Sequence, residues 1–439
     1  MTQVAIDRQL TNGRLNKIHV EDRSVHDWYR FVLSFPPHLV RTYIERFGID
    51  ETQHVLDPFC GTGTVAVECK KQGIPSVSLE AHPFAHFAST VKIDWNLDPE
   101  GLIAHARRVK EEALDILGNQ GISDIPPKQG PQEMQAQLKV LSPQAEKLLL
   151  RGSISPLPLH KTLVLLECLE HRQVASYYRH ELLALSRALV DTISNVHFGP
   201  EIGVGPIKPD AKVIAPWFAN VTAMAEDLYG LDGPTETAIV HHADARHISD
   251  VLEPESIDAV ITSPPYPNEK DYTRTTRLEL VLLGFVTNRT QLRELKQGLL
   301  RSNTKGVYKD DDDDQLVVNQ EAVQRFAADI EAQRIKLGKT SGFERLYARV
   351  TKLYFGGMAQ HLADLRIVLR PGAQLAYVVG DQASFLRVLI RTGQTLAEIA
   401  QSLGYEVVGI ELFRTRLATT TGMQLPEEVV LLRWPGFNH

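Results

Sequence analysis

The sequence has few cysteines, no long apolar run and no excess of positive charge. Its 439 residues include only three cysteines, Cys60, Cys69 and Cys168, and none belongs to a Cys-x-x-Cys pair. This sparse, odd set argues against a disulfide framework or a structural zinc site and fits a reducing, cytoplasmic setting. No stretch approaches the roughly 20 apolar residues of a membrane span, and the first residues have no apolar core of an export signal. We therefore expect neither export nor a membrane, and the 16 histidines form no pattern that indicates a metal.

Positive charge is concentrated locally, although the net charge of the chain is −7. Residues 270–309 hold nine Lys and Arg against three acidic residues, and residues 332–352 hold six against one. Either segment could bind phosphate groups or could be an ordinary helix surface. Between them Asp310 to Asp314 form an unbroken run of five aspartates. Such a run is typical of a solvated, mobile loop rather than of a metal site, because nothing fixes its geometry.

Apolar runs that end in turns alternate with helical patterns near both ends of the chain. Residues 28–48 predict an amphipathic helix after a Pro-Pro start, with Gly48 as its stop. A strand, a glycine turn, a helix, a second strand ending in Glu80 and a second helix follow. The rhythm resumes with expected strands at 238–248, 257–266, 372–381, 405–413 and 427–434. This alternation predicts an α/β fold with a doubly wound, mostly parallel sheet.

The middle of the chain differs in character. Residues 98–235 show helical patterns separated by Pro-rich breaks, which predicts a helical insertion far longer than an ordinary loop. The expected organisation has three parts. Residues 1–97 hold the N-terminal helix and the first half of the α/β domain, 98–235 the insertion, and 236–439 the second half.

The clearest motif is DPFCGTGT, which spans Asp57 to Thr64 at the end of the first strand. Glycines in such a turn let the backbone approach a ligand closely, and an acidic residue that ends the next strand can accept hydrogen bonds from ribose hydroxyls. Glu80 occupies that position, and Asp244 ends a third strand. A lone Gly-x-Gly turn is a common structural feature, but the full combination is more specific.

A second motif is Ser-Pro-Pro-Tyr at 263–266, directly after a predicted strand. Together the two motifs resemble the S-adenosylmethionine-dependent DNA amino-methyltransferases, a family with a Rossmann-like fold. The segment FPPHLV from Phe35 to Val40 resembles the part of the family that closes over the methionine end of the cofactor. The resemblance covers most of the chain outside 98–235. It implies that S-adenosylmethionine contacts a set of residues near the two motifs: Phe35, Pro36, Asp57, Phe59, Gly61, Thr62, Gly63, Thr64, Glu80, Asp244 and Ala245.

The resemblance also assigns the catalytic roles. The Ser263 hydroxyl and the Pro264 carbonyl would accept hydrogen bonds from an exocyclic amino group and draw its nitrogen towards a tetrahedral geometry. The rigid Pro264-Pro265 pair supplies carbonyls without competing N–H donors. Tyr266 would stack on a base flipped out of double-stranded DNA, and the methyl group would move by direct in-line attack. Roles for Tyr272 and Asp381 stay open, and Cys60 is expected to be a packing residue.

Ser263 in this motif favours N4 of cytosine as the target, with N6 of adenine as the alternative. An RNA guanine-N2 methyltransferase and a catalytically silent cofactor-binding partner protein are further possibilities. Cytosine-C5 chemistry is disfavoured because no cysteine adjoins a proline. Target recognition is expected from 98–235, or else from the basic lid-like segment 270–352. Arg274 and Arg277 are expected to contact phosphate, and a cognate restriction endonuclease or another defence component is a possible partner.

Overall fold

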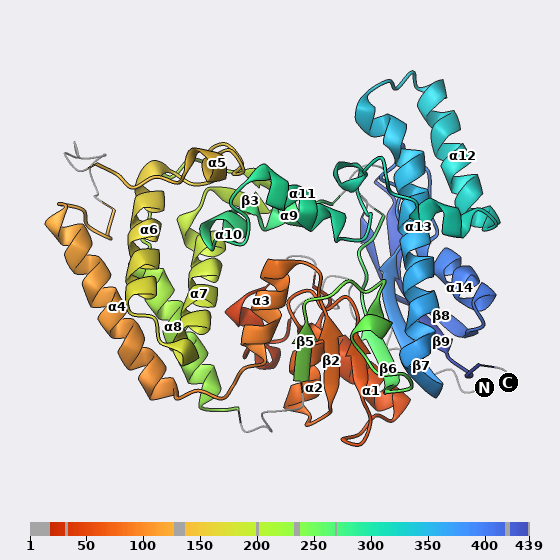
Figure 1. Cartoon of the computed structure of the whole chain (residues 1–439), viewed down its shortest axis with the longest axis horizontal. Helices are drawn as coiled ribbons and strands as arrows, with labels where there is room; N and C mark the ends of the chain where they lie inside the picture. The colour runs from red at the N-terminus through yellow and green to blue at the C-terminus, as the bar shows by residue number, and fades with distance from the viewer. Residues whose placement is uncertain are drawn as a thin grey trace.

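A seven-stranded sheet forms the centre of the computed structural model, which describes residues 18–30, 34–126, 137–198, 202–231, 238–267, 270–417 and 422–437 (Figure 1). Its strand order is β5-β2-β1-β6-β7-β9-β8, and only β9 runs antiparallel to its neighbours. The predicted doubly wound, mostly parallel sheet is confirmed. In this order the strands are β5 (Ala238–His241), β2 (Ser76–Leu79), β1 (Val55–Asp57), β6 (Ile257–Thr262), β7 (Leu369–Gly380), β9 (Gln424–Arg433) and β8 (Glu406–Leu417).

The strand order reverses between β1 and β6. Following the chain from β1, the strands β2 and β5 add on one side, whereas β6 and β7 add on the other. In the register, Val55 lies opposite Ser76 on β2 and opposite Ala259 on β6. Because the strands are parallel, their carboxyl ends meet at one edge, and a ligand site is expected where the order reverses.

Helices cover both faces of the sheet. On one face α1 (Pro37–Phe47) and α2 (Thr64–Lys71) share an apolar cluster with Val55, Ala259 and Ile261. On the other face α13 (Gly342–Val368) and α14 (Thr392–Ser402) pack against Leu56 and Val260. β1 and β6 are largely apolar in sequence because helices cover both faces of these strands.

The helix predicted after the Pro-Pro pair is confirmed as α1. Pro36 is extended, with ψ 147°, and Pro37 takes the first helical position, where its missing N–H costs nothing. The helix ends at Gly48, whose φ of +66° lies in the left-handed region that favours glycine.

A group of helices lies beside the β5 edge of the sheet (Figure 1). Its residues share one apolar core with Phe84 and Phe87 of α3 (Pro83–Lys92), and Trp217 and Leu165 lie fully inside that core. The group also carries a short hairpin of β3 (Val196–Phe198) and β4 (Ile202–Val204). The helices are α4 (Pro99–Asn119), α5 (Pro143–Glu146), α6 (Pro156–His171), α7 (Ala175–Ala188) and α8 (Ile214–Leu228).

The basic segment after β6 connects this helical group to the far side of the sheet (Figure 1). It contains α9 (Tyr272–Thr275), α10 (Arg277–Leu282) and α11 (Arg289–Gln297). Two short 3₁₀ turns, η5 (Thr304–Gly306) and η6 (Asp313–Val317), then lead to α12 (Glu321–Lys336), which packs along α13. No helix in the described part of the chain is long and apolar enough to cross a membrane.

The prediction of a fully solvated loop at Asp310–Asp314 is wrong for two of its members. Asp311 forms an ion pair with Arg301 at 2.9 Å, and Asp313 forms one with Arg246 at 2.8 Å. The backbone of Asp313 also packs against Gly356 of α13. The run is therefore held by basic partners that are distant in the sequence, which composition could not reveal.

Gly356 is required by this packing. A Cβ added there would lie 1.8 Å from the Asp313 carbonyl oxygen, whereas a Cβ at Gly342 on the same helix would meet nothing within 4 Å. We expect Gly356→Ala to lower the free energy of unfolding by about 1–3 kcal/mol through overpacking, as measured by chemical denaturation. Gly342→Ala is the matched control and should change it by less than about 0.5 kcal/mol. Equal stabilities of the two variants would contradict this packing of Asp313 on α13.

Candidate active site

A cavity of about 330 Å³ opens at the carboxyl ends of the central strands. It lies where the strand order reverses, the place where open parallel sheets bind ligands. The segments after β1, β2, β5 and β6 line it, and so do the basic segment and the β8–β9 pair. Elements from both ends of the chain thus meet around one space.

Most of the residues predicted for a site are found together here. The cavity is lined by Phe35, Phe59, Gly61, Thr62, Thr64, Glu80, Asp244, Ala245, Ser263, Pro264, Pro265 and Tyr266. Tyr272 lines it as well. The structure does not place Pro36, Asp57, Gly63, Arg274, Arg277 or Asp381 among the lining residues. Several charged lining residues belong to neither motif and were not predicted as site residues: Lys270, Asp271, Lys296, Arg301, Arg414, Arg416 and Glu427.

The glycine turn is fastened to the end of β2 by a carboxylate. Glu80 accepts hydrogen bonds from the Gly61 N–H at 2.7 Å and from the His82 N–H at 2.8 Å. Gly61 has a φ of +55° and Gly63 a φ of +85°, so both adopt a backbone conformation that favours glycine. Burial raises the pKa of Glu80 to about 7. Its carboxyl group therefore titrates close to neutral pH at the wall of the cavity.

Asp57 joins β1 to β6 beneath the cavity. One of its carboxylate oxygens accepts a hydrogen bond from the Thr262 hydroxyl at 2.6 Å and another from the Phe59 N–H at 3.2 Å. The side chain is fully buried, which raises its pKa to about 7. Asp57 thus fixes the glycine turn relative to the segment that begins at Ser263, without lining the cavity itself.

The Ser-Pro-Pro-Tyr segment follows β6 directly and is held by the neighbouring strands. The Ser263 hydroxyl donates to the Val378 carbonyl of β7 at 3.0 Å, and the Tyr266 hydroxyl donates to Glu427 of β9 at 3.5 Å. Gly380 makes room for the tyrosine, because a Cβ there would lie 3.1 Å from the Tyr266 ring. The segment therefore has a defined position at the cavity wall.

Two arginines and a carboxylate form the wall beside Tyr266. Arg414 donates through Nε to Glu427, and Arg416 donates to the Asp381 carbonyl. Glu427 is 7% exposed, and the Nε atom of Arg416 lies 4.0 Å from its carboxylate. The Asp381 carboxylate itself accepts from the Thr392 N–H at the start of α14. This wall thus presents guanidinium donors next to the aromatic ring.

The two arginines predicted as phosphate contacts lie outside the cavity lining. Arg277 donates to the Thr273 carbonyl at 2.9 Å and to the Leu148 carbonyl at 3.2 Å. Arg277 therefore ties the basic segment to the helical group. The Nε atom of Arg274 is buried without a hydrogen-bond partner.

Cys60 of the glycine turn is buried. Burial raises the pKa of the Cys60 thiol well above its ordinary value, so the side chain behaves as a packed, protonated thiol. Among the described residues, no three or more His, Cys, Asp or Glu side chains are grouped so that they could hold a metal ion.

The doubly wound sheet brings the glycine turn and the Ser-Pro-Pro-Tyr segment into one cavity, which is a Rossmann-like arrangement. A model of the DNA methylase family N6_N4_Mtase matches residues 12–89. The type II methyltransferase M.BsoBI of Geobacillus stearothermophilus is 25% identical, over 93% of this chain and 83% of the relative. The type II methyltransferase M.AvaI of Nostoc sp. is 23% identical, over 94% of this chain and 84% of the relative.

The crystal structure of TrmN from Thermus thermophilus is similar over 94% of this chain and 52% of that chain, with 12% identity and a TM-score of 0.31. The family match and the type II relatives both show that the chain is similar to N4/N6 DNA methyltransferases. Members of this family use S-adenosylmethionine.

The raised pKa of Glu80 has a measurable effect on stability. Its carboxyl group is protonated up to about pH 7 in the folded chain but ionises near its ordinary value of 4.5 when unfolded. The folded state thus binds more protons between these values, so this group lowers stability as the pH rises from about 4.5 to about 7.

We expect Glu80→Gln to remove that part of the pH dependence. From pH 5 to pH 8, the free energy of unfolding of the variant should rise relative to the wild type by about 1–2 kcal/mol. Chemical denaturation across this range tests it. Parallel pH profiles for the two proteins would show that Glu80 has an ordinary pKa.

Proposed function

We propose that the chain transfers a methyl group from S-adenosylmethionine to the exocyclic N4 amino group of cytosine in double-stranded DNA. The observation that carries this proposal is the shared cavity of the Gly61 turn, Glu80 and Ser263–Tyr266. The bound cofactor would then lie close to the residues that accept hydrogen bonds from the target amino group, as an in-line transfer requires.

The cavity offers suitable partners for the cofactor. Glu80 and Asp244 are acceptors for hydroxyl and amino groups, Gly61 allows a close backbone approach, and Phe35 and Phe59 supply apolar surface. We assign the cofactor contacts to these residues, with Ala245, Thr62 and Thr64 beside them. We also propose that Asp57, Gly63 and Pro36 shape the site from below its surface. When bound, the cofactor supplies a methyl group on an electrophilic sulfonium.

Ser263 is oriented for the role of an acceptor. Because its hydroxyl hydrogen is directed to the Val378 carbonyl, the oxygen lone pairs stay available for an amino N–H. The Pro264 carbonyl would accept the second N–H, and the Pro264-Pro265 pair keeps the backbone rigid. Tyr266, held by Gly380 and Glu427, would stack on the flipped base.

The wall beside Tyr266 favours cytosine over adenine. Along its Watson–Crick edge cytosine presents two acceptors beside the amino group, N3 and O2, whereas adenine presents N1 and a C–H there and has its other acceptor, N7, on the opposite side of the amino group. Arg414 and Arg416 are donors only, so they suit two acceptors better than one. Ser263 in the motif favours the same base.

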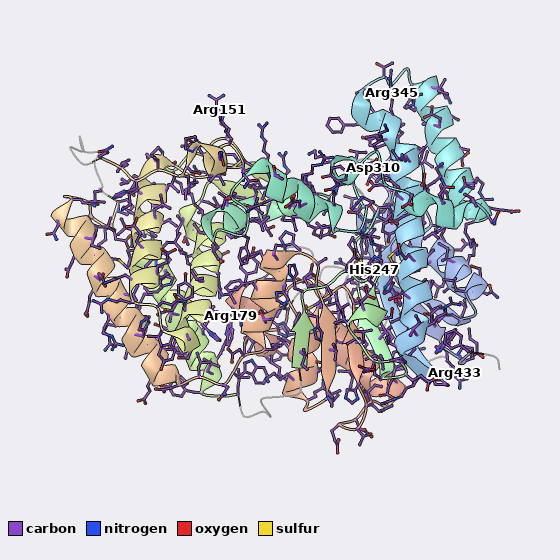
Figure 2. The ribbon with its side chains drawn as sticks, viewed as in Figure 1. Arg151, Arg179, His247, Asp310, Arg345 and Arg433 are labelled. Carbon is purple, nitrogen blue, oxygen red and sulfur yellow. The ribbon has the colours of Figure 1, made fainter. Side chains whose placement is uncertain are left out.

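We propose that DNA lies across the edge of the molecule where the basic segment is found. Figure 2 shows Arg151 and Arg345 projecting on this side, from the helical group and from the α12–α13 pair. We propose the helical group within 98–235 as the target-recognition region and 270–352 as a lid, with Arg274 and Arg277 near phosphate. A cognate restriction endonuclease stays a prediction.

The modified base identifies the reaction directly. We expect DNA from a host that lacks other methylation, after expression of the chain, to contain N4-methylcytosine in one short sequence. Sequencing that separates N4-methylcytosine from N6-methyladenine is the measurement. N6-methyladenine alone would replace the cytosine assignment with the adenine one, and unmodified DNA would contradict the proposed reaction.

Substitutions separate catalysis from cofactor binding. We expect Ser263→Ala and Tyr266→Ala each to lower kcat by about 100-fold or more, since they remove positioning that acts on the reacting amino group. Their cofactor Kd should stay within about twofold of the wild type, whereas Glu80→Ala should raise it by about 10–100-fold.

Ser256→Ala is the matched control, because Ser256 precedes the opposite end of β6 and its hydroxyl bonds the Glu253 carbonyl at the surface. It should leave both quantities unchanged. Full turnover by the Tyr266 variant would refute the stacking role, and an unchanged cofactor Kd for the Glu80 variant would refute the ribose contact.

A further inference from the structure

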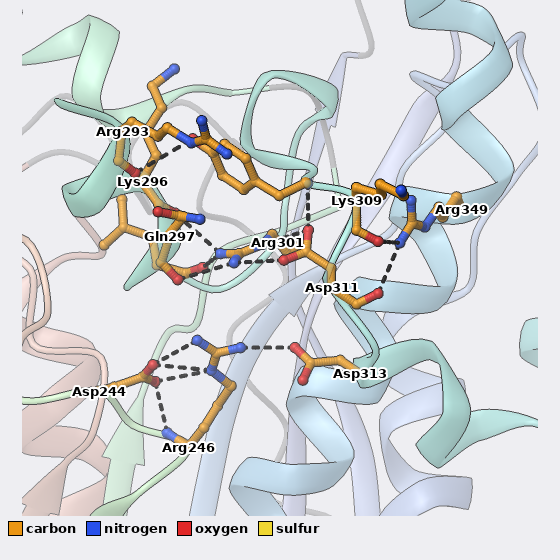
Figure 3. Close-up of polar contacts among 12 residues, drawn as sticks. Asp244, Arg246, Arg293, Lys296, Gln297, Arg301, Lys309, Asp311, Asp313 and Arg349 are labelled. Atoms are coloured by element: carbon orange, nitrogen blue, oxygen red, sulfur yellow. Dashed lines mark hydrogen bonds and ion pairs between the residues drawn. The ribbon is translucent and has the colours of Figure 1, made fainter. Parts of the chain in front are cut away.

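The aspartate run at 310–314 lies directly behind the wall of the cavity, and its members differ in environment. Asp311 and Asp313 form ion pairs within the protein (Figure 3). Asp310 and Asp312 are exposed and form no ion pair within the described part of the chain. The proposed function gives this run no role. Asp311 nevertheless contacts Arg301, which lines the cavity, and Asp313 contacts Arg246, which binds the lining residue Asp244.

Asp313 is connected through Arg246 to Asp244, a residue of the cavity lining. The Arg246 guanidinium donates to Asp313 through Nη1 at 2.8 Å and to Asp244 through Nη2 at 2.7 Å. Its Nε atom lies 3.1 and 3.2 Å from the two Asp244 oxygens. The Nε and Nη2 side of the guanidinium therefore faces the Asp244 carboxylate. Asp244 lines the cavity. Its orientation is thus set by a guanidinium that Asp313 holds from the other side.

Asp311 binds Arg301, a residue of the cavity lining. Arg301 is 5% exposed and lines the cavity, and it donates to Asp311 through Nε at 3.0 Å and Nη2 at 2.9 Å. Its remaining donors reach the Lys296 and Gln297 carbonyls at the end of α11, at 3.1 and 3.0 Å. Arg301 therefore fastens the end of α11 to the aspartate run.

The run itself is anchored on the long helix α13. Arg349 donates to the Asp311 carbonyl at 2.8 Å and to the Lys309 carbonyl at 3.2 Å. Farther along α13, Gly356 and Gly357 give close contact with Asp313. A continuous chain of contacts thus leads from α13, which packs on the sheet, through the run to the cavity (Figure 3).

We infer that Asp311 and Asp313 are positioning residues for the cofactor and that the carboxylate charge of Asp313 sets the hydrogen-bonding strength of Asp244. Arg246 has a single positive charge and two carboxylate partners, so Asp244 keeps acceptor capacity for a bound ligand. Without the Asp313 charge, Arg246 would neutralise Asp244 more fully. This inference depends on the proposed function only for the identity of the ligand.

The test compares isosteric variants within one run of identical residues. Asp313→Asn and Asp311→Asn remove a charge that is paired with an arginine, whereas Asp310→Asn and Asp312→Asn remove one that is not. The binding of S-adenosylmethionine to the full chain is measured by calorimetric titration. We expect Asp313→Asn to raise Kd by about tenfold, as for the loss of a charge-assisted contact, Asp311→Asn to raise it severalfold, and the two controls to stay within about twofold.

A second measurement separates positioning from general stability. In an Asp244→Asn background, Asp313→Asn should have no further effect on Kd, because its influence passes through Asp244. Asp313→Glu, which keeps the charge, should recover part of the affinity. An equal effect of Asp313→Asn in both backgrounds, or a Kd equal to that of Asp310→Asn, would overturn the inference.

The outcomes distinguish this inference from the proposed function. A wild type that binds the cofactor but modifies no DNA would contradict the proposed function and leave the positioning role intact. A wild type that methylates cytosine, with an unchanged cofactor Kd for the Asp313 and Asp311 variants, would contradict only the positioning role.

Discussion

The parallel pairing of β1 with β6 is the constraint on which the rest of the site depends. It sets the start of the glycine turn beside the start of the Ser-Pro-Pro-Tyr segment, although about 200 residues separate them in the chain. The hydrogen bond between Thr262 and Asp57 fixes this adjacency beneath the cavity at 2.6 Å. Parallel strands direct their carboxyl ends to one edge, so the glycine turn and the Ser-Pro-Pro-Tyr segment, which follow β1 and β6, meet at one cavity.

Charge around the cavity is arranged in separate sectors. Carboxylates at Glu80 and Asp244 stand on the side of the glycine turn, whereas Arg414 and Arg416 stand beside Tyr266. The first sector suits a ligand with hydroxyl and amino donors, and the second suits a base with ring acceptors. Glu427 and the aspartate run neutralise part of the positive charge, which lets several cations lie close together behind one wall.

Sequence reasoning predicted the sheet, the helix after the Pro-Pro pair and the part of the cavity lining that the two motifs supply, because these depend on local patterns. A glycine turn after an apolar strand and an acidic residue after the next strand can be recognised in single segments. The walls supplied by Arg301, Arg414, Arg416 and Glu427 could not be recognised in this way. Their place follows from how the basic segment and the β8–β9 pair fold back over the strand ends, and no short motif encodes that. The aspartate run was misjudged for the same reason, since its arginine partners are not marked by any local pattern.

The central claim is that the amino-group acceptors and the methyl donor occupy one cavity at the β1–β6 edge. A crystal structure of the chain with S-adenosylhomocysteine and a duplex that carries its target sequence tests this most directly. The account predicts a flipped cytosine stacked on Tyr266, with its amino nitrogen bonded to Ser263 and Pro264. The methyl position, built by geometry onto the cofactor sulfur, should lie about 3–3.5 Å from that nitrogen. A cofactor bound away from the Gly61 turn, or a base that never enters the cavity, would contradict the account.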